Sequence, residues 1–317
     1  MGVTQPAPGR PIGELPLAGG GGEPVDLART LASHGVATLP PQLVDQAAGT
    51  LETTLSLGGG QARTIRIRAG RVGHVAVEVL GSAPSAADRT LLATARRLLN
   101  LDRDLSRFYA MAAADPSLAW AASGAGRMLR SPTVFEDVVK TVCTTNCAWS
   151  ATVRMVTRIV ADLGDPAPDG RRAFPAPAAL TGAGEAFFRD EVRAGYRGKY
   201  LLRLASDAAD GTLDLERLRD PELPDSEVMQ CLLALPGVGP YAAAHVMLTS
   251  LGRYRQLILD SWTRPTYARL NGRKATDRGI ERRFRKFRDY AGLAFWLYLT
   301  RDWVDEPASE EDADLVP

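Results

Sequence analysis

The chain has 317 residues, of which 45% are hydrophobic and 24% charged, and its 38 basic and 37 acidic residues give a formal net charge of +1 at pH 7. This composition indicates a globular protein of two or three domains and excludes a broadly basic protein that coats nucleic acid. Three cysteines cannot supply a four-thiolate metal or iron-sulfur site. No apolar run approaches the ~20 residues of a membrane span and no signal peptide is recognisable, which predicts a reduced, intracellular protein.

The first 24 residues are rich in Gly, Pro and Ala. The run Gly19 to Gly22 lacks the Gly-Lys-Ser/Thr ending of a phosphate-binding loop, so residues 1–24 are predicted to form a flexible leader. Residues 25–35 suit a short helix or strand. In three later segments, side chains that suit the two faces of a strand alternate along the chain, and glycine-rich turns separate the segments. This pattern predicts three strands and a β-rich domain over residues 25–83. These segments are residues 50–57, 64–67 and 74–80.

From Pro84 onward the pattern of apolar residues is typical of helices. Stretches rich in Pro and Gly interrupt it at about residues 162–177 and 207–224. The helical domain is expected to span residues 84–303, and residues 304–317, rich in Asp and Glu, are predicted to be an acidic disordered tail. The predicted fold class is therefore mainly α with an N-terminal α+β module.

A short turn, Leu235-Pro236-Gly237-Val238-Gly239, lies between two segments with helical spacing, 226–235 and 240–251. Its glycines admit positive φ and lack Cβ atoms, and Pro240 suits the first helical turn. Such a turn lets a ligand approach the backbone closely, and the amide groups at the start of the second helix attract an anion such as a DNA phosphate. The alternative is a simple connector between helices.

A single acidic residue, Asp260, ends the apolar run Leu257 to Leu259, at 21 positions beyond Gly239. Another helix is expected to begin here, and Asp is a common N-cap. Capping alone is therefore one interpretation of Asp260. Capping and catalysis are compatible roles for one carboxylate.

The hairpin followed by Asp260 at this spacing resembles the helix-hairpin-helix superfamily of base-excision DNA glycosylases. The resemblance is nearest to the 8-oxoguanine and 3-methyladenine enzymes and runs, with gaps, over about residues 85–303. Its other matching segments are residues 101–109, 131–146, 194–201 and 289–294. It implies a two-lobed helical fold behind a β-rich N-terminal domain. The active site would lie in the cleft between the lobes, with the hairpin and Asp260 on one side and residues 143–146 on the other. The resemblance also implies a monomer that acts on double-stranded DNA with a damaged base, in the cytoplasm or nucleoid, or in the nucleus of a eukaryote.

The resemblance assigns catalysis to Asp260, which would stabilise the positive charge that develops on the deoxyribose. At Tyr241, members that also cut the DNA strand carry a lysine that forms a Schiff base. Because a phenol cannot form an imine, the resemblance implies a monofunctional enzyme whose nucleophile is water. It implies no cofactor, apart from a monovalent cation that the hairpin could hold, and no iron-sulfur cluster. The hairpin residues that would hold the DNA backbone are Leu235, Gly237, Val238 and Gly239.

The resemblance also places a base pocket around Tyr241 and His245, which are four residues apart on one helix face. Trp262, Phe295 and Leu299 complete the predicted pocket. Phe295 and Leu299 stand where the 8-oxoguanine enzymes place a Gln and a Phe that read the oxidised base, which disfavours that base. An aromatic pocket suits an electron-poor or cationic base such as an alkylated purine. Ordinary core packing is the alternative for His245 and Phe295.

Positive charge is concentrated directly after Asp260, because residues 264–288 contain ten Lys or Arg and two acids. Arg264, the first of them, is a predicted DNA contact, although such a run is often only a solvated helix face. Asn146 matches a family residue that fills the gap left by a flipped nucleotide; the alternative is a turn or cap residue. Lys140 and Lys199 are expected to face DNA or solvent, and the basic stretch that begins at Arg127 is a candidate phosphate contact.

Three functions remain open at this point. The first is a monofunctional DNA glycosylase that flips a damaged base, such as an alkylated purine, and hydrolyses its N-glycosidic bond. The second is a non-catalytic damaged-DNA-binding protein of the same fold, against which the presence of Asp260 argues. The third is an 8-oxoguanine-type glycosylase/lyase with an atypical amine, which borohydride trapping would distinguish.

Overall fold

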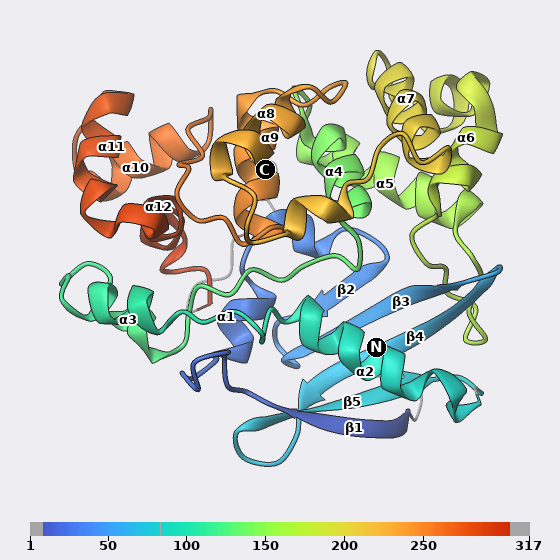
Figure 1. Ribbon diagram of the computed structural model, residues 1–317, viewed down its shortest axis with the longest axis horizontal. Coiled ribbons are helices and arrows are strands. Elements are labelled where there is room, and N and C mark those ends of the chain that lie inside the picture. Colours follow the sequence, from blue (N-terminus) through green and yellow to red (C-terminus); the bar gives the residue numbers. More distant parts are fainter. Residues whose placement is uncertain (1–8, 83, 305–317) are drawn as a thin grey trace, which may run out of the picture.

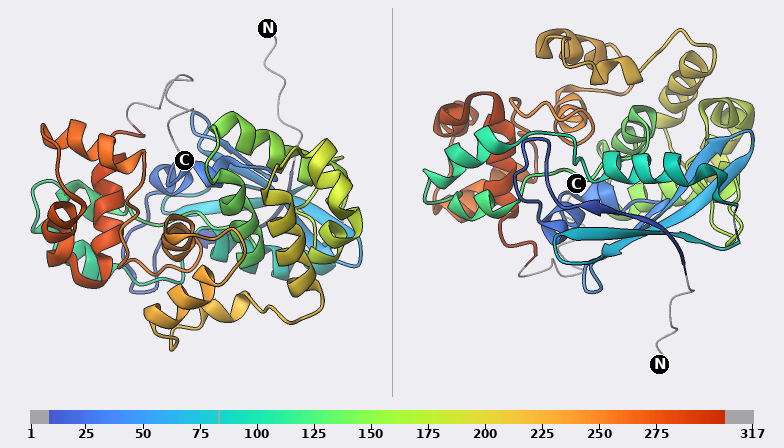
Figure 2. Two further views of the ribbon diagram at one scale, coloured as in Figure 1. Left: turned by 90° about the horizontal axis from the view of Figure 1, so that it is seen from above. Right: turned by 60° about the horizontal axis from the view of Figure 1, so that its bottom comes forward.

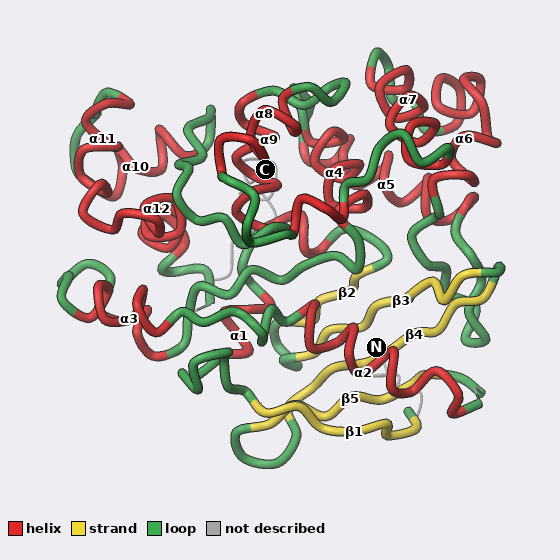
Figure 3. Tube along the Cα trace, in the orientation of Figure 1, coloured by secondary structure: helices red, strands yellow, loops and turns green. Residues whose placement is uncertain are grey.

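The computed structural model describes residues 9–82 and 84–304. An antiparallel sheet with the strand order β1-β5-β4-β3-β2 forms the N-terminal module, and helices follow it to Thr300 (Figures 1 and 3). This arrangement confirms the predicted mainly α fold with an N-terminal α+β module. The strands are β1 (Arg10–Pro16), β2 (Gln42–Asp45), β3 (Thr50–Gly58), β4 (Gln61–Ala69) and β5 (His74–Leu80).

The three predicted strands are confirmed as β3, β4 and β5, whereas β1 and β2 were not predicted. Both missed strands are edges of the sheet. β1 contains three residues that weaken a strand signal, Pro11, Gly13 and Pro16, and β2 has only four residues. Proline is tolerated at an edge because one side of the strand has no partner to receive its amide. Short or proline-containing edges also discourage pairing with other chains.

The prediction of a flexible leader over residues 1–24 is wrong for residues 10–24. β1 pairs along β5, and Glu23 anchors the glycine-rich loop that follows. Its carboxylate accepts hydrogen bonds from the amides of Gly21 at 2.9 Å and Leu105 at 2.7 Å and pairs with the fully buried guanidinium of Arg127. Arg127 therefore does not face DNA or solvent, contrary to expectation. Residues 1–8 and 305–317 lie outside the described residues.

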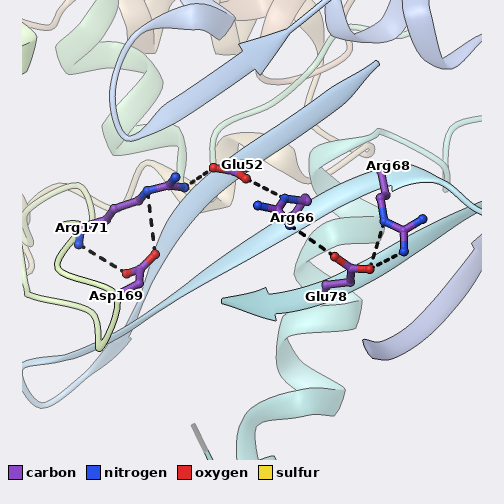
Figure 4. Close-up of polar contacts among 6 residues, drawn as sticks. All are labelled: Glu52, Arg66, Arg68, Glu78, Asp169 and Arg171. Carbon is purple, nitrogen blue, oxygen red and sulfur yellow. Dashed lines mark hydrogen bonds and ion pairs between the residues drawn. The ribbon is translucent and has the colours of Figure 1, made fainter. Parts of the chain in front are cut away.

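The two faces of the sheet differ in chemistry. Apolar side chains on one face pack against helix α2 (Asp88–Leu98) in a common core. On the other face, ion pairs run across the strands, with 2.6 Å between Arg66 and Glu52 and 3.6 Å between Arg66 and Glu78 (Figure 4). Arg171, from the loop after α5, pairs with Glu52. Because α5 belongs to the helical domain, this pair ties that domain to the sheet.

The helical domain has two lobes with separate cores. Helices α4–α7 and α10–α12 lie on opposite sides of α8 and α9 in both views of Figure 2, as in Figure 1. The helices not yet given are α1 (Leu27–Leu31), α3 (Ser106–Ala113), α4 (Val134–Thr144), α5 (Trp149–Leu163), α6 (Pro177–Ala186), α7 (Arg197–Ala209), α8 (Asp225–Leu233), α9 (Pro240–Thr249), α10 (Thr263–Asn271), α11 (Asp277–Phe284) and α12 (Ala291–Thr300). The predicted interruptions at residues 162–177 and 207–224 match the gaps before α6 and α8.

Helix α9 joins the two lobes. Its residues from Ala242 to Thr249 are all buried, and they divide between the cores. Ala243 and Val246 pack in the core of α4–α8, whereas Ala244 and Leu248 pack with α12. A helix that is apolar on all sides requires partners on all sides, which places α9 at the centre of the domain. None of the described helices is long and apolar enough to span a membrane.

Candidate active site

The turn between α8 and α9 forms the predicted hairpin. Gly237 has φ +80°, and a Cβ atom there would lie 2.7 Å from the Cδ2 atom of Tyr200, so glycine is required. Gly239 precedes α9 at φ −94°, and a Cβ atom there would meet nothing within 4 Å. Pro240 occupies the first helical position, so the amides of Tyr241 and Ala242 have no intrahelical acceptor. These amides are available to an anion.

Asp260 caps the start of α10, as predicted. Its Oδ1 atom accepts hydrogen bonds from the amides of Trp262 at 2.9 Å and Thr263 at 2.6 Å. In return, the Thr263 hydroxyl accepts a hydrogen bond from the Asp260 amide at 2.9 Å. These reciprocal bonds hold the carboxylate in one orientation. Within the described part of the chain, no group donates to the second carboxylate oxygen, Oδ2.

Hairpin and carboxylate open into one cavity of about 790 Å³. Six residues predicted for the site line it: Asn146, Gly237, Gly239, Tyr241, Asp260 and Trp262. The other lining residues are Thr144, Thr145, Cys147, Trp149, Thr152, Tyr196, Tyr200, Pro240, Ala242, Leu259 and Ser261. Segments separated by more than 100 residues in the sequence therefore converge on a single concave site.

The cavity lies between the lobes, but the structure places the hairpin on a different side of the cavity from the one predicted. The sequence led us to expect the hairpin and Asp260 on one side and the segment around Asn146 on the other. Val238 of the hairpin instead shares the core of Cys143, just before Asn146. The neighbours of Asp260, Leu259 and Trp262, pack against the core of α12. Asp260 therefore faces the other two segments across the cavity.

The cavity combines a single carboxylate with many aromatic rings. Among the described residues that line it there is no Lys, Arg or His, and Asp260 is the single carboxylate. Burial, with a further contribution from Asp260, raises the pKa of Tyr241 to about 12, and its phenol stays protonated at neutral pH. The five aromatic residues of the lining are Trp149, Tyr196, Tyr200, Tyr241 and Trp262.

Comparison with solved structures identifies this architecture. MBOgg1 in complex with a low affinity DNA ligand superposes with a TM-score of 0.70, 21% identity and coverage of 91% of this chain and 95% of its own. The 3-methyladenine DNA-glycosylase from Archaeoglobus fulgidus superposes with a TM-score of 0.69 and 20% identity, and the match covers 91% of this chain and 97% of that enzyme. The apo-form of the Clostridium acetobutylicum 8-oxoguanine glycosylase/lyase superposes with a TM-score of 0.63 and 20% identity, and the match covers 84% of this chain and 92% of that enzyme.

The chain has the helix-hairpin-helix DNA glycosylase fold. Identities near 20% establish the shared fold and leave the substrate and the reaction to be argued from the site. No protein-family model matches the sequence, and no curated protein matches it.

Three residues predicted for the base pocket do not line this cavity of the glycosylase fold. Phe295 is fully buried, with its ring 5.2 Å from that of Phe284 and 6.1 Å from that of Tyr267. Leu299 and His245 are likewise buried in the interior. The prediction is wrong for all three because α9 and α12 pack on all sides, so only the start of α9 reaches the cavity. The argument against 8-oxoguanine from Phe295 and Leu299 therefore loses its structural basis.

Other predicted DNA contacts are engaged within the protein. Leu235 and Val238 pack in the core below the hairpin. A ligand at the hairpin would therefore meet the backbone and not these two side chains. Arg264 is exposed and forms a bidentate pair with Asp277, with both distances below 3 Å. Lys140 is fully buried, 2.7 Å from Glu136, which corrects the expectation of a solvated residue.

Sequence reasoning missed two exposed tyrosines at the rim. Tyr196 is 52% exposed and Tyr200 36% exposed, and their rings lie 5.9 Å apart. The Asn146 amide donates a hydrogen bond to the Tyr196 hydroxyl at 3.2 Å, with Asn146 at φ +50°. Arg197 lies beneath Tyr196 and donates to the Thr145 carbonyl at 3.0 Å. The spacing of four between the tyrosines, at the start of a helix, was the available signal.

Two buried histidines lie behind the cavity, and they predict a loss of stability in acid. The rings of His34 and His245 are 5.7 Å apart. Burial lowers the pKa of both imidazoles, that of His245 to about 3. Below pH 6.5 the unfolded chain therefore binds more protons than the folded chain, and the free energy of unfolding falls as the pH falls. For His245 we expect a loss that approaches about 1.4 kcal/mol per pH unit below about pH 6, and His34 adds a loss of the same sign.

Urea unfolding of the parent and of His245→Gln at pH 7 and pH 5 measures this loss. The variant should lose the contribution of His245 and keep that of His34, so its stability should depend less steeply on pH than that of the parent. Equal pH dependence in the two proteins would contradict the prediction for His245.

Proposed function

We propose that this protein is a monofunctional DNA glycosylase, which flips an alkylated, cationic purine out of duplex DNA and hydrolyses its N-glycosidic bond with water. The observation that carries the proposal is the cavity, in which one carboxylate faces five aromatic residues and none of the described lining residues carries an amine. None of these residues can therefore form a Schiff base with the sugar. The fold shared with a 3-methyladenine DNA-glycosylase supports the same class of reaction.

The bond-breaking step follows from charge. Loss of the base leaves positive character on the deoxyribose, and a fixed carboxylate stabilises it. Two backbone amides hold Oδ1 of Asp260, so the carboxylate needs no reorganisation when that charge develops. Oδ2 is left to orient the attacking water. Flipping costs a few kcal/mol, which is smaller where damage has weakened pairing or stacking.

The cavity lining favours a base that is already cationic. An alkylated purine with a formal positive charge leaves as a neutral base and needs no proton donor. A neutral purine needs one, and the lining offers only the phenol of Tyr241 and similarly weak donors. Attraction between a cation and an aromatic face contributes about 0.5–2 kcal/mol per contact. Stacking between rings such as Trp149 and Trp262 would add to this selectivity.

Double-stranded DNA is the proposed partner, held at the hairpin. The free amides of Tyr241 and Ala242 and the positive end of the α9 dipole suit a backbone phosphate. The complex of MBOgg1 with a DNA ligand supports this partner. Asn146 and the tyrosine rim lie at the cavity mouth, where they would contact the DNA around the flipped nucleotide.

Base release from a panel of duplexes with single alkylated, oxidised or deaminated bases tests the proposal. Strand breaks that appear only after hot alkali, on cationic alkylpurines, are the expected result. Breaks without alkali, together with a borohydride-trapped adduct, would instead establish a lyase. Tight binding without release from any duplex would favour the non-catalytic alternative.

Replacing Gly239 with Val should weaken binding to duplex DNA by about 10- to 100-fold. A side chain there meets no protein atom but obstructs the approach of a phosphate, and hydrogen bonds to charged groups contribute about 1.5–3 kcal/mol. Titration of a fluorescent duplex measures the change. Gly182→Val adds the same side chain at another open position, in α6, and should bind normally. Parental affinity in Gly239→Val would reduce the hairpin to a connector.

A further inference from the structure

Basic side chains gather beyond the cavity, on α10, α11 and the helical turn η6 (Arg285–Tyr290). Residues 264–288 contain ten basic and two acidic residues, a formal excess of eight positive charges. Since the whole chain carries +1, its other residues carry a formal excess of seven negative charges. Six of these seven negative charges belong to residues 305–317, which lie outside the described residues, so the described remainder is close to neutral and the positive charge is concentrated in residues 264–288, next to the cavity.

The structure separates these ten residues into two groups. Three have partners: Arg264 pairs with Asp277, Arg283 bonds to Tyr267 and Asn271, and Lys286 pairs with Asp115. The other seven are exposed, and none of them forms an ion pair within residues 9–82 and 84–304. We name these seven the basic face: Arg269, Arg273, Lys274, Arg278, Arg282, Arg285 and Arg288.

The basic face continues directly from the cavity wall. α10 begins at Thr263, whose amide bonds to the Asp260 carboxylate. The Arg264–Asp277 pair then brings the first residue of α11 to the first turn of α10. Helices α10 and α11 lie on the opposite side of α8 and α9 from α4–α7 (Figures 1 and 2). A duplex seated at the hairpin would therefore meet the basic face on one side of the lesion only.

We propose that the basic face is a second DNA-binding surface, which holds the phosphate backbone of one duplex arm beside the lesion. This inference rests on the proposed function. Duplex DNA carries one negative charge per ~1.7 Å of axis, so an eight-residue helix of ~12 Å lies along about seven phosphates. The seven residues of the basic face come from α10, α11, η6 and the loop between α10 and α11, so together they supply positive charge for several of these phosphates. Because this charge lies on one side of the hairpin, its field favours one orientation of the duplex.

The slope of affinity against salt concentration tests this surface. Each phosphate contact contributes about 0.9 to the slope of log K against log salt. We expect the triple variant Arg273→Ala, Lys274→Ala, Arg278→Ala to reduce that slope by about 2–3, and to bind roughly 10- to 100-fold more weakly at physiological salt. The probe is a duplex with a central uncharged abasic-site analogue and arms of about two helical turns, ~20 base pairs.

A matched control removes the same charge elsewhere. The variant Arg71→Ala, Arg89→Ala, Arg97→Ala removes three exposed arginines, one from the turn between β4 and β5 and two from α2, and it should keep the parental slope. Shortening the probe one arm at a time gives a second readout. The parent should lose affinity when one particular arm is shortened, and the basic-face variant should be insensitive to both.

Two results would contradict the proposed DNA-binding role of the basic face while leaving the proposed function intact. One is an equal change of slope in the two triple variants. The other is a parent that responds equally to shortening of either arm. A parent that binds no duplex, damaged or undamaged, would instead overturn the proposed function itself, together with this inference.

Discussion

Asp260→Asn is expected to lower the rate of base release by about 10²- to 10³-fold, the range seen when one preorganised electrostatic group is removed. Asn keeps the shape of Asp and an oxygen that accepts the bonds from the Trp262 and Thr263 amides, so the cap of α10 should survive. Only the negative charge is lost, and it is needed mainly in the transition state. Affinity for a damaged duplex should therefore change by only a few-fold.

Single-turnover release together with equilibrium binding measures both quantities. Asp277→Asn is the matched control, since it neutralises an exposed carboxylate on the neighbouring helix, outside the cavity, and it should release base normally. Asp260→Ala removes the cap as well as the charge and should lose about 1 kcal/mol of stability in addition. Parental release by Asp260→Asn would reduce Asp260 to a capping residue.

Glu23→Gln should lower the free energy of unfolding by about 3–5 kcal/mol, the usual effect of breaking a buried ion pair. The Arg127 side chain is fully buried and that of Glu23 is 5% exposed, so the substitution leaves a charge without its counter-charge. The one oxygen of Gln can still accept the hydrogen bond from the Leu105 amide, whereas its NH2 group replaces the oxygen that accepts from Gly21, so that bond is lost together with the charge. Urea unfolding at pH 7 measures the loss.

Glu14→Gln is the control for this prediction. It breaks the exposed pair of Glu14 with Arg71, and exposed pairs contribute about 0–1 kcal/mol. Adding Arg127→Met to Glu23→Gln should restore much of the loss, because it removes the stranded charge. An unchanged urea midpoint in Glu23→Gln would mean that the buried pair contributes nothing to stability.

The positions of Phe295 and His245 could not be predicted from the sequence. Both lie in helices that are buried along their length, α12 and α9. When a helix is apolar on all sides, its sequence pattern does not indicate which face lines a cavity and which face packs in a core. Packing of two lobes around α9 decides this, and it turns both side chains inward. The exposed Tyr196 and Tyr200 reach the rim for the same reason, through the placement of α7.

The N-terminal module shows the same limit for the fold. β3, β4 and β5 were predicted because alternation within one strand reports its two faces. β1 could not be recognised, since an edge strand that tolerates Pro and Gly resembles a linker until its partner, β5, is in place. The glycine-rich loop after β1 is held by Glu23 and Arg127, 104 residues apart.

What the sequence determined by itself was local. The conformation of the hairpin depends on Gly237, with its φ of +80°, and on Pro240, and the cap depends on Asp260 and the amides up to three residues beyond it. Backbone conformation and capping are settled by residues within one turn, so their pattern is legible in the chain. The tertiary structure alone decided which side chains line the cavity, that none of the described lining residues carries an amine, and that seven cations beside it have no ion-pair partner within residues 9–82 and 84–304. These properties depend on contacts between segments far apart in sequence, which no local pattern encodes.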